Sequence, residues 1–232
     1  MDHAEGLAKR LDQGVVVENK GGAGGNIGAT SVANADGDGQ IILLTTTGIH
    51  SISPSLYKTL PFDHIKDFKP IAPVVDAPNV ILVRNTLPVK TLDELVRYAK
   101  DKPGALNLAV PGNGTSPHLA AELLKSIAKI DLTNVTYRGG APAFSDLVSG
   151  QVDLLVDAVT TATPHINAGT VRALAVTSKT RSPLLPTVPA TAETIPGYEM
   201  NVWWGLMAPS KTPGSIVDRL NCENAVAVSR SS

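Results

Sequence analysis

Short β-branched runs alternate with amphipathic helical stretches along most of the chain. Three runs rich in Val, Ile and Leu predict strands over residues 14–18, 40–45 and 79–83. A capping box at Thr91 and Glu94 then opens a predicted helix, because each side chain satisfies a free backbone amide of the other residue. Its apolar residues recur at three, four and seven positions, and Lys102-Pro103-Gly104 ends it.

The same alternation continues through the second half of the chain. Further strands are predicted over 105–110, 134–138, 151–156 and 171–177, and helices over 142–149 and 163–168. In the helix that begins near Pro117, the buried face is expected to consist of Leu119, Leu123, Ile127 and Ile130. Strands and helices that alternate in this way predict an α/β fold of parallel βαβ units with right-handed crossovers.

The stretch 181–196 departs from this alternation of strands and helices. Residues 181–196 contain four prolines and no helix cap. Because proline interrupts both helices and central strands, the stretch is interpreted as a connector between two lobes.

Composition and charge narrow the function classes. The 232 residues carry a formal net charge of −1 and only 4% aromatic residues, which disfavours binding of nucleic acid. Cys222 is the single cysteine, so one chain holds neither a disulfide nor a cysteine-based metal site. No apolar run approaches the roughly 20 residues of a membrane span, and the chain does not open with a signal peptide.

The candidate chemistry lies in four polar loops that directly follow predicted strands. They are Thr45–Gly48, Gly112–Ser116, Arg138–Ala141 and Asp157–Thr160. Glycine lets backbone amides approach a ligand closely, short hydroxyls add donors, and helix N-termini favour anions. The loops therefore suit a carboxylate or a phosphate at the carboxyl ends of the strands. The alternative for each loop is an ordinary helix cap or turn, which uses the same residue types.

Two charged residues in these loops have two interpretations each. Arg138 is a candidate clamp for a carboxylate, or else an exposed, solvated arginine. Asp157 is a candidate acceptor for a hydroxyl or ammonium group of the ligand, or else a helix N-cap.

No motif supports catalysis or a cofactor. The glycines of 22–28 imitate a dinucleotide fingerprint, but their spacing is G-x-G-x-x-x-G and the acidic residue expected after the next strand is missing. Neither H-E-x-x-H nor G-x-S-x-G occurs. His118, one turn into a helix, is interpreted as a capping or packing residue. We predict no catalytic residue, no metal and no cofactor.

The glycine-rich segment 15–28 and several later segments resemble one known protein family. Residues 15–28, Val-Val-Val-Glu-Asn-Lys-Gly-Gly-Ala-Gly-Gly-Asn-Ile-Gly, resemble the V-E-N-[RK]-x-G-A-G-G-N-I-G signature of the Bug-type receptors, the extracytoplasmic solute-binding proteins of tripartite tricarboxylate transporters. The similarity spans roughly residues 4–221 in the family's order. Further matching segments are Pro61–Asp63 with Asp67-Phe68, Gly112–Leu119, Tyr137–Ala143, Ala173–Thr177, Arg181–Pro189, Trp204–Leu206 and Ala208-Pro209.

The resemblance implies a monomeric, non-enzymatic periplasmic receptor that delivers a small carboxylate to the permease subunits of a membrane transporter. It implies a type II periplasmic-binding-protein-like α/β fold of two lobes, each a mostly parallel sheet flanked by helices, with the ligand cleft between them. Lobe one would comprise 1–81 plus 198–232, and lobe two 82–197. With Arg138 added from the loop argument, the predicted ligand-binding residues are Thr46, Thr47, Asn113, Gly114, Thr115, Ser116, Arg138, Gly139, Gly140 and Asp157.

The chain departs from the family pattern at both ends. Members begin with a signal peptide and a strand that ends in a Pro-Gly-Gly loop, whereas this sequence starts in the helix that would follow. Residues 222–232 match nothing in the pattern. The resemblance therefore implies an incomplete lobe one: a fragment, a misassigned start or a degraded gene copy. The alternatives to a receptor are an α/β enzyme, either a nucleotide-dependent oxidoreductase or a hydrolase, and a fragment that no longer binds a ligand.

Overall fold

The chain divides into two compact units. The computed structural model describes residues 3–229, and each unit is described by itself. Unit 1 contains the residues up to Asp76 and those from Trp203 onward, and unit 2 contains Ala77–Val202. The boundaries expected from the sequence, at 81/82 and 197/198, fall inside unit 2. They would divide a strand that belongs entirely to the sheet of unit 2, and would remove Tyr198, which is 1% exposed in its core.

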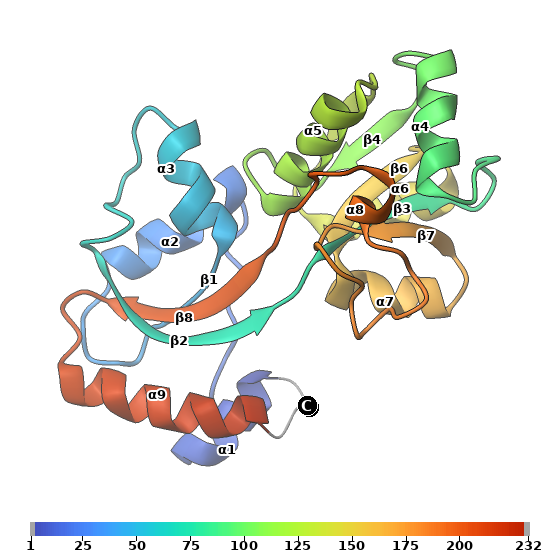
Figure 1. Cartoon of the computed structure of the whole chain (residues 1–232). Coiled ribbons are helices and arrows are strands. Elements are labelled where there is room, and N and C mark those ends of the chain that lie inside the picture. The colour runs from blue at the N-terminus through green and yellow to red at the C-terminus, as the bar shows by residue number, and fades with distance from the viewer. Residues whose placement is uncertain (1–2, 230–232) are drawn as a thin grey trace. The chain divides into compact units, whose positions relative to one another are not determined.

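Unit 2 is built on a five-stranded sheet with strand order β5-β4-β6-β3-β7. Strands β3, β4, β6 and β7 are labelled in Figure 1. Its strands are β3 (Asn79–Arg84), β4 (Asn107–Val110), β5 (Thr133–Thr136), β6 (Leu154–Ala158) and β7 (Val171–Val176). Its helices are α4 (Leu92–Asp101), α5 (Ser116–Ala128), α6 (Gly140–Ser149), α7 (Val159–Asn167) and α8 (Thr191–Thr194). The ladders β4–β5 and β4–β6 are parallel, whereas β3 runs antiparallel to both β6 and β7.

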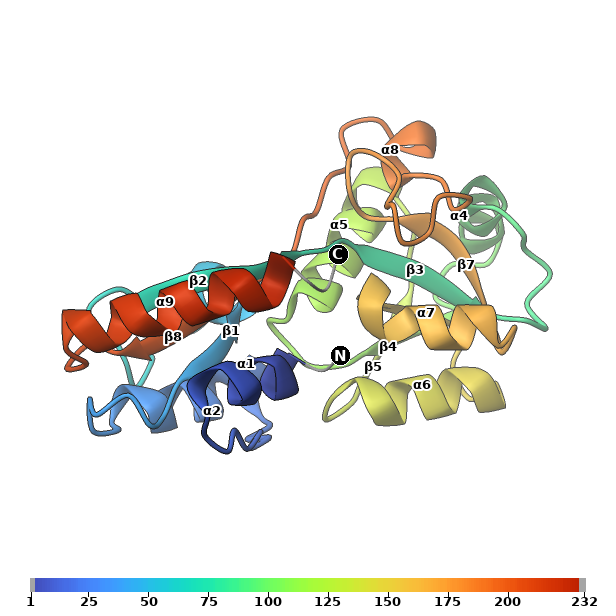
Figure 2. The same ribbon diagram turned by 90° about the horizontal axis from the view of Figure 1, so that it is seen from below.

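Helices cover both faces of this sheet (Figure 2). Successive side chains of a strand point to opposite faces, so Ile81 and Val83 pack in one cluster with α4, α5 and the segment after α8 that contains Ile195 and Tyr198. Val80 and Leu82 pack in a second cluster with α6 and α7. Because both faces of β3 are buried, its sequence is a continuous apolar run rather than an alternating one.

The buried face of α5 differs from the one expected. Its fully buried apolar residues are Ala120, Ala121, Leu124 and Ala128, whereas Leu119 and Leu123 are half-buried and Ile127 is exposed. The predicted buried face was therefore wrong for Ile127 and only partly right for Leu119 and Leu123, whereas Ile130, just beyond the helix, is buried as predicted. Small alanines let the helix approach the sheet closely, and that preference is not visible in a count of large apolar residues.

The proline-rich stretch 181–196 is not a connector between lobes. It lies wholly inside unit 2, where Leu185, Val188 and Ile195 are buried. An exposed ion pair between Arg181 and Glu193 joins the two ends of the stretch and lowers the pKa of the Glu193 carboxyl to about 2. The prolines therefore shape a packed loop, and composition alone did not distinguish it from a linker.

Unit 1 has a three-stranded sheet with order β1-β8-β2. Its strands are β1 (Leu43–Thr46), β2 (Phe68–Asp76) and β8 (Trp203–Pro209), and its helices are α1 (His3–Leu11), η1 (Ala23–Gly25), α2 (Asn26–Ala33), η2 (Gly48–Ile52), α3 (Ser53–Leu56) and α9 (Gly214–Ser229). Both ladders are antiparallel. A mostly parallel sheet was expected here, but β8 comes from the far end of the chain and enters between β1 and β2 in the opposite direction.

Residues 14–18 do not form the predicted strand. They lie outside any helix or strand, and the Val16 side chain is 90% exposed. A β-branched run becomes a strand only where a neighbouring strand accepts and donates its ladder hydrogen bonds. In the described part of the chain, no strand pairs with this segment.

Candidate functional site

Three polar loops of unit 2 meet at the carboxyl ends of β4, β5 and β6. The parallel register brings these ends to one edge of the sheet, with Val110 opposite Thr136 in the β4–β5 ladder. Beyond the strands, the backbone N–H of Tyr137 donates to the Val110 carbonyl (2.8 Å) and that of Gly139 donates to the Pro111 carbonyl (2.8 Å). The predicted loops after β4 and β5 are therefore fastened directly to each other.

Two predicted ligand residues of the β4–α5 loop are engaged within the loop itself. Thr115 is the N-cap of α5: its hydroxyl accepts from the His118 amide and donates to the Gly112 carbonyl (2.7 Å). The Gly114 amide donates to His118 Nδ1 (3.1 Å). The interpretation of His118 as a capping residue agrees with this geometry. Asn113 is exposed, and Ser116 opens the helix with a buried side chain.

The N-terminus of α6 has no side-chain cap. Gly139 is the N-cap residue with φ 110°, a conformation that favours glycine, and Gly140 and Ala141 follow as the first helical residues. Within the described residues, no acceptor is bound by the backbone N–H groups of Ser116, Gly140 or Ala141. These amides and the two helix dipoles form a region that attracts an anion.

Asp157 lies beside Gly140. One oxygen of its carboxyl, Oδ1, accepts from the backbone N–H of Ala158 (2.7 Å). The other, Oδ2, is so close to Gly140 that a Cβ at that position would lie 2.7 Å away. Burial raises the pKa of the Asp157 carboxyl, against the opposing effects of hydrogen bonds from Ala158 and Thr161. The N-cap residue of α7 is Ala158, so Asp157 is not the N-cap.

The loop between β5 and α6 is anchored by a tyrosine and exposes an arginine. The Tyr137 hydroxyl donates to Asp146 Oδ2 (2.7 Å), and desolvation together with this carboxylate raises the pKa of Tyr137 to about 12. Arg138 is exposed, and its side chain has no hydrogen-bond or ion-pair partner among the described residues. Its guanidinium is therefore available to an incoming anion.

The two threonines predicted as ligand residues in unit 1 have local partners. The Thr47 hydroxyl accepts from the Trp203 backbone N–H (2.9 Å) and lies 3.4 Å from the Trp203 carbonyl oxygen, and the side chain is buried. The Thr46 hydroxyl accepts from the Gly48 N–H (3.2 Å). Thr47 thus fastens the end of β1 to β8, which is a structural role that the sequence pattern did not reveal.

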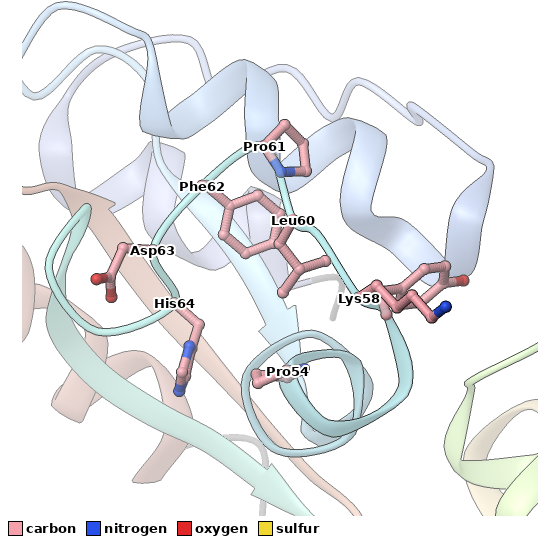
Figure 3. Close-up of a pocket in the computed structure, with 8 residues that line it drawn as sticks. Pro54, Lys58, Leu60, Pro61, Phe62, Asp63 and His64 are labelled. Carbon is pink, nitrogen blue, oxygen red and sulfur yellow. The ribbon is translucent and has the colours of Figure 1, made fainter.

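An open pocket of about 560 Å³ lies elsewhere in unit 1. Figure 3 shows Lys58 and Asp63 at its two ends, with Leu60 and Phe62 between them. None of the predicted ligand residues lines it. The Asp63 carboxyl accepts the backbone N–H groups of Ile65 and Lys66, which lower its pKa and shape the turn beside the pocket.

Within residues 3–229, no three or more His, Cys, Asp or Glu side chains form a group that holds a metal ion. In the same part of the chain, no helix is long and apolar enough to cross a membrane.

In α/β folds, ligands bind at the carboxyl ends of the strands, and unit 2 gathers its open helix N-termini at that edge of its sheet. The profile of the TctC family, described as tripartite tricarboxylate transporter family receptor, matches residues 2–230. The chain belongs to this family. The membership confirms the resemblance seen in the sequence and the predicted fold class, and the family is one of non-enzymatic binding proteins.

Known relatives and solved structures agree with this assignment. A UPF0065 protein from the tcbD-tcbE intergenic region of Pseudomonas sp. (strain P51) is 42% identical over 219 residues, which are 94% of this chain and 65% of that relative. The chain thus spans about two thirds of the relative's length. Three solved structures each match 97% of this chain. They are Rpa4515 of R. palustris with adipate (36% identity, TM-score 0.94, 75% of that chain), the periplasmic binding protein BugD (41%, 0.92, 75%) and MatC of Rhodopseudomonas palustris with bound malate (35%, 0.90, 77%).

Proposed function

We propose that this protein binds a small carboxylic acid and delivers it to the membrane permease of a tripartite tricarboxylate-type transporter. The observation that carries the proposal is the set of open backbone amides of Ser116, Gly140 and Ala141 at the ends of two adjoining parallel strands. The ligand carboxylate would accept from these amides, and the exposed guanidinium of Arg138 would add charge from the rim.

The chemistry of the site supports an acid rather than an uncharged solute. A carboxylate has two oxygens with about four acceptor positions, which matches a group of donors that comes from the backbone. Two helix N-termini add positive potential without a fixed charge. Relatives of similar fold bind adipate and malate, which are both carboxylates.

The remaining parts of the proposal follow from the family. A receptor of a tripartite transporter would work in the periplasm and hand its ligand to permease subunits, and BugD is a periplasmic binding protein. Thr46 and Thr47 stay predicted ligand neighbours from unit 1, and a monomeric state stays a prediction.

Calorimetric titration of the chain with carboxylic acids of three to six carbons tests the proposal. A ligand at about 100 times its dissociation constant should also stabilise the fold by about 2.7 kcal/mol, which thermal unfolding detects. In Gly140→Ala the added methyl meets Asp157 Oδ2 and intrudes among the open amides, so we expect at least a tenfold loss of affinity.

The matched control is Gly214→Ala, because an added Cβ there has no atom within 4 Å and the site is far along the chain. Its affinity should equal that of the parent. A folded parent that binds no acid of the series contradicts the proposed function. Equal affinities of Gly140→Ala and the parent would show that the acid does not bind at these amides.

A further inference from the structure

His50 of η2 packs against both strands that lead to the boundary of unit 1. Asp76 ends β2 and is the last residue of unit 1 before the chain passes into unit 2, and it pairs with Trp203, the residue at which unit 1 resumes. The rings of His50 and Trp203 are stacked, with centroids 6.3 Å apart and 24° between their planes. On another side, the His50 ring meets Phe68 of β2 edge to face, with centroids 5.2 Å apart.

The same helical turn also holds the backbone of Trp203. Thr47, the N-cap residue of η2, accepts the Trp203 backbone N–H with its hydroxyl (2.9 Å). One short helix thus fixes Trp203 twice, through its amide at Thr47 and through its ring at His50. A change in the His50 ring therefore acts directly on the start of β8.

The hydrogen bond of His50 defines a neutral ring. Nδ1 lies 2.9 Å from the His64 carbonyl oxygen, which only accepts, so the hydrogen atom is on Nδ1 and the neutral Nε2 carries a lone pair. Nε2 is buried and has no hydrogen-bond partner among the described residues. A proton on Nε2 would add a buried donor without an acceptor, together with a charge that is partly removed from water.

The surroundings of His50 do not offset such a charge. The charged or titratable residues of the turn before β2 and of β2 itself are Asp63, His64, Lys66, Asp67, Lys69 and Asp76, and β1, η1, α3 and β8 carry none. The Asp63 and Asp67 carboxyls accept backbone N–H groups of their own turn, and Lys69 donates to the Thr212 carbonyl (2.7 Å). The Trp203 ring lies beyond the roughly 6 Å at which an aromatic face attracts a cation appreciably.

We propose that His50 is a pH-sensitive support of the unit boundary: its neutral ring holds Trp203 in place, and protonation of the ring loosens the start of β8. This role needs no bound ligand and does not depend on the proposed function.

The sign of the effect follows from the pKa of His50. Burial lowers this pKa most, the hydrogen bond to the His64 carbonyl opposes the change, and the charge of the His64 ring lowers the pKa further. Above the ordinary value of 6.5, His50 is neutral in the folded and the unfolded chain. Below it, the unfolded chain binds a proton that folded unit 1 does not, so unit 1 loses stability until the pH reaches the lowered value.

Urea unfolding of a Trp204→Phe parent from about pH 8 to about pH 5 tests the proposal, because Trp203 is then the single tryptophan. Between the two pKa values of His50, the unfolding equilibrium constant followed by Trp203 fluorescence should rise about tenfold per pH unit. His50→Asn in the same background keeps a donor for the His64 carbonyl but does not titrate. It should lack this rise.

His64→Asn is the matched control, because it removes the neighbouring imidazole and keeps the backbone carbonyl that His50 contacts. It should retain most of the pH dependence. A parent-like rise in His50→Asn overturns the proposal, and a rise lost only in His64→Asn assigns the titration to His64 instead. Stability that increases on acidification would show that the aromatic rings favour the charged form, and would also overturn it.

A second measurement covers the case in which His50→Asn does not fold. The imidazole signals of His50 in the parent, followed by NMR against pH, report its protonation in the folded state. A titration midpoint below 6.5, with Trp203 signals that shift in parallel, is expected. A midpoint at or above 6.5 contradicts the proposal.

Discussion

The two units differ in how many of their buried polar side-chain atoms lack a hydrogen-bond partner. In unit 2, β3 is buried on both faces, and Asn79 is the only residue of that unit with buried side-chain polar atoms that lack a partner. In the described part of unit 1, such atoms occur in six residues: Asn26, Thr45, His50, Ser53, Thr212 and Asn224. Large apolar groups are exposed in both units, for example Val16 at 90% in unit 1 and Leu184 at 55% in unit 2.

This difference shows what each unit can support by itself. A sheet covered on both faces holds its strand ends rigidly. The open amides of α5 and α6 in unit 2 therefore lose little conformational entropy when a ligand binds. An unpaired buried polar group costs free energy, so we expect a lower free energy of unfolding for unit 1. We therefore expect unit 2 to be the more stable unit and to carry the organised part of the site.

The largest effect is expected from a cavity in unit 2. Leu155→Ala removes a fully buried side chain between β6 and its covering helices, and should lower the unfolding free energy of unit 2 by about 2–5 kcal/mol. Hydrogen exchange of β3 and β6 amides measures it. The control Leu184→Ala, at a side chain that is 55% exposed, should change stability by less than about 0.5 kcal/mol.

The same variant tests whether the units are independent. Both tryptophans, Trp203 and Trp204, lie in unit 1, so their fluorescence follows the unfolding of that unit. An unchanged fluorescence transition in Leu155→Ala is expected. A fluorescence transition that shifts together with the hydrogen exchange of unit 2 would mean that the two units unfold as one and do not differ in stability.

A smaller effect is expected at the Thr47 hydroxyl in unit 1. Thr47→Val leaves the Trp203 backbone N–H without its acceptor in a buried place, at a cost of about 1–3 kcal/mol. Tryptophan fluorescence during urea unfolding detects the change. Thr47→Ser keeps the hydroxyl and should retain most of the stability; a loss equal to that of the valine variant would assign the effect to the methyl group instead.

Loss of the α5 cap should have a milder effect. Thr115→Ala removes the acceptor for the His118 amide and the donor to the Gly112 carbonyl, and should cost about 1 kcal/mol of stability in unit 2. Amide exchange in the first turn of α5 should accelerate most. Thr115→Ser is the matched control, and a protection pattern unchanged by alanine would contradict the capping role.

The smallest expected effect depends on pH and concerns Asp157. A carboxyl whose pKa is raised in the folded state stabilises the fold below its unfolded pKa, near 3.8, and this contribution is lost as the pH rises through the raised value. Asp157→Asn has no charge to bury, so its melting temperature should exceed that of the parent at pH 7 and approach it at low pH. A variant that is less stable than the parent at pH 7 would show that the ionised carboxylate is stabilising.

Local patterns were sufficient to predict much of this protein. The continuous apolar run of β3, the Thr91 cap of α4 and the polar loops after β4, β5 and β6 are all present where the sequence indicated them. The reciprocal half of the predicted capping box is different, because the Glu94 carboxylate accepts from the Lys90 N–H and not from that of Thr91. These features depend on neighbours within one turn or one strand, and the matches to one family supplied the arrangement of the elements. The fold class and the family followed from them.

Three outcomes depended on contacts between distant residues. The valines of 14–18 are β-formers without a ladder partner, three alanines and Leu124 form the inner face of α5, and the prolines of 181–196 pack into unit 2. The features of the candidate site also fall into those set by the local sequence and those set by tertiary contacts. The sequence determined which loops are rich in amides and hydroxyls, but only the tertiary structure decided that Thr47, Gly114 and Thr115 use theirs internally while Ser116, Gly140 and Ala141 leave theirs open. A residue type fixes how many hydrogen bonds a group can make, whereas the partner that takes each bond is set by the packing of segments far apart in the chain.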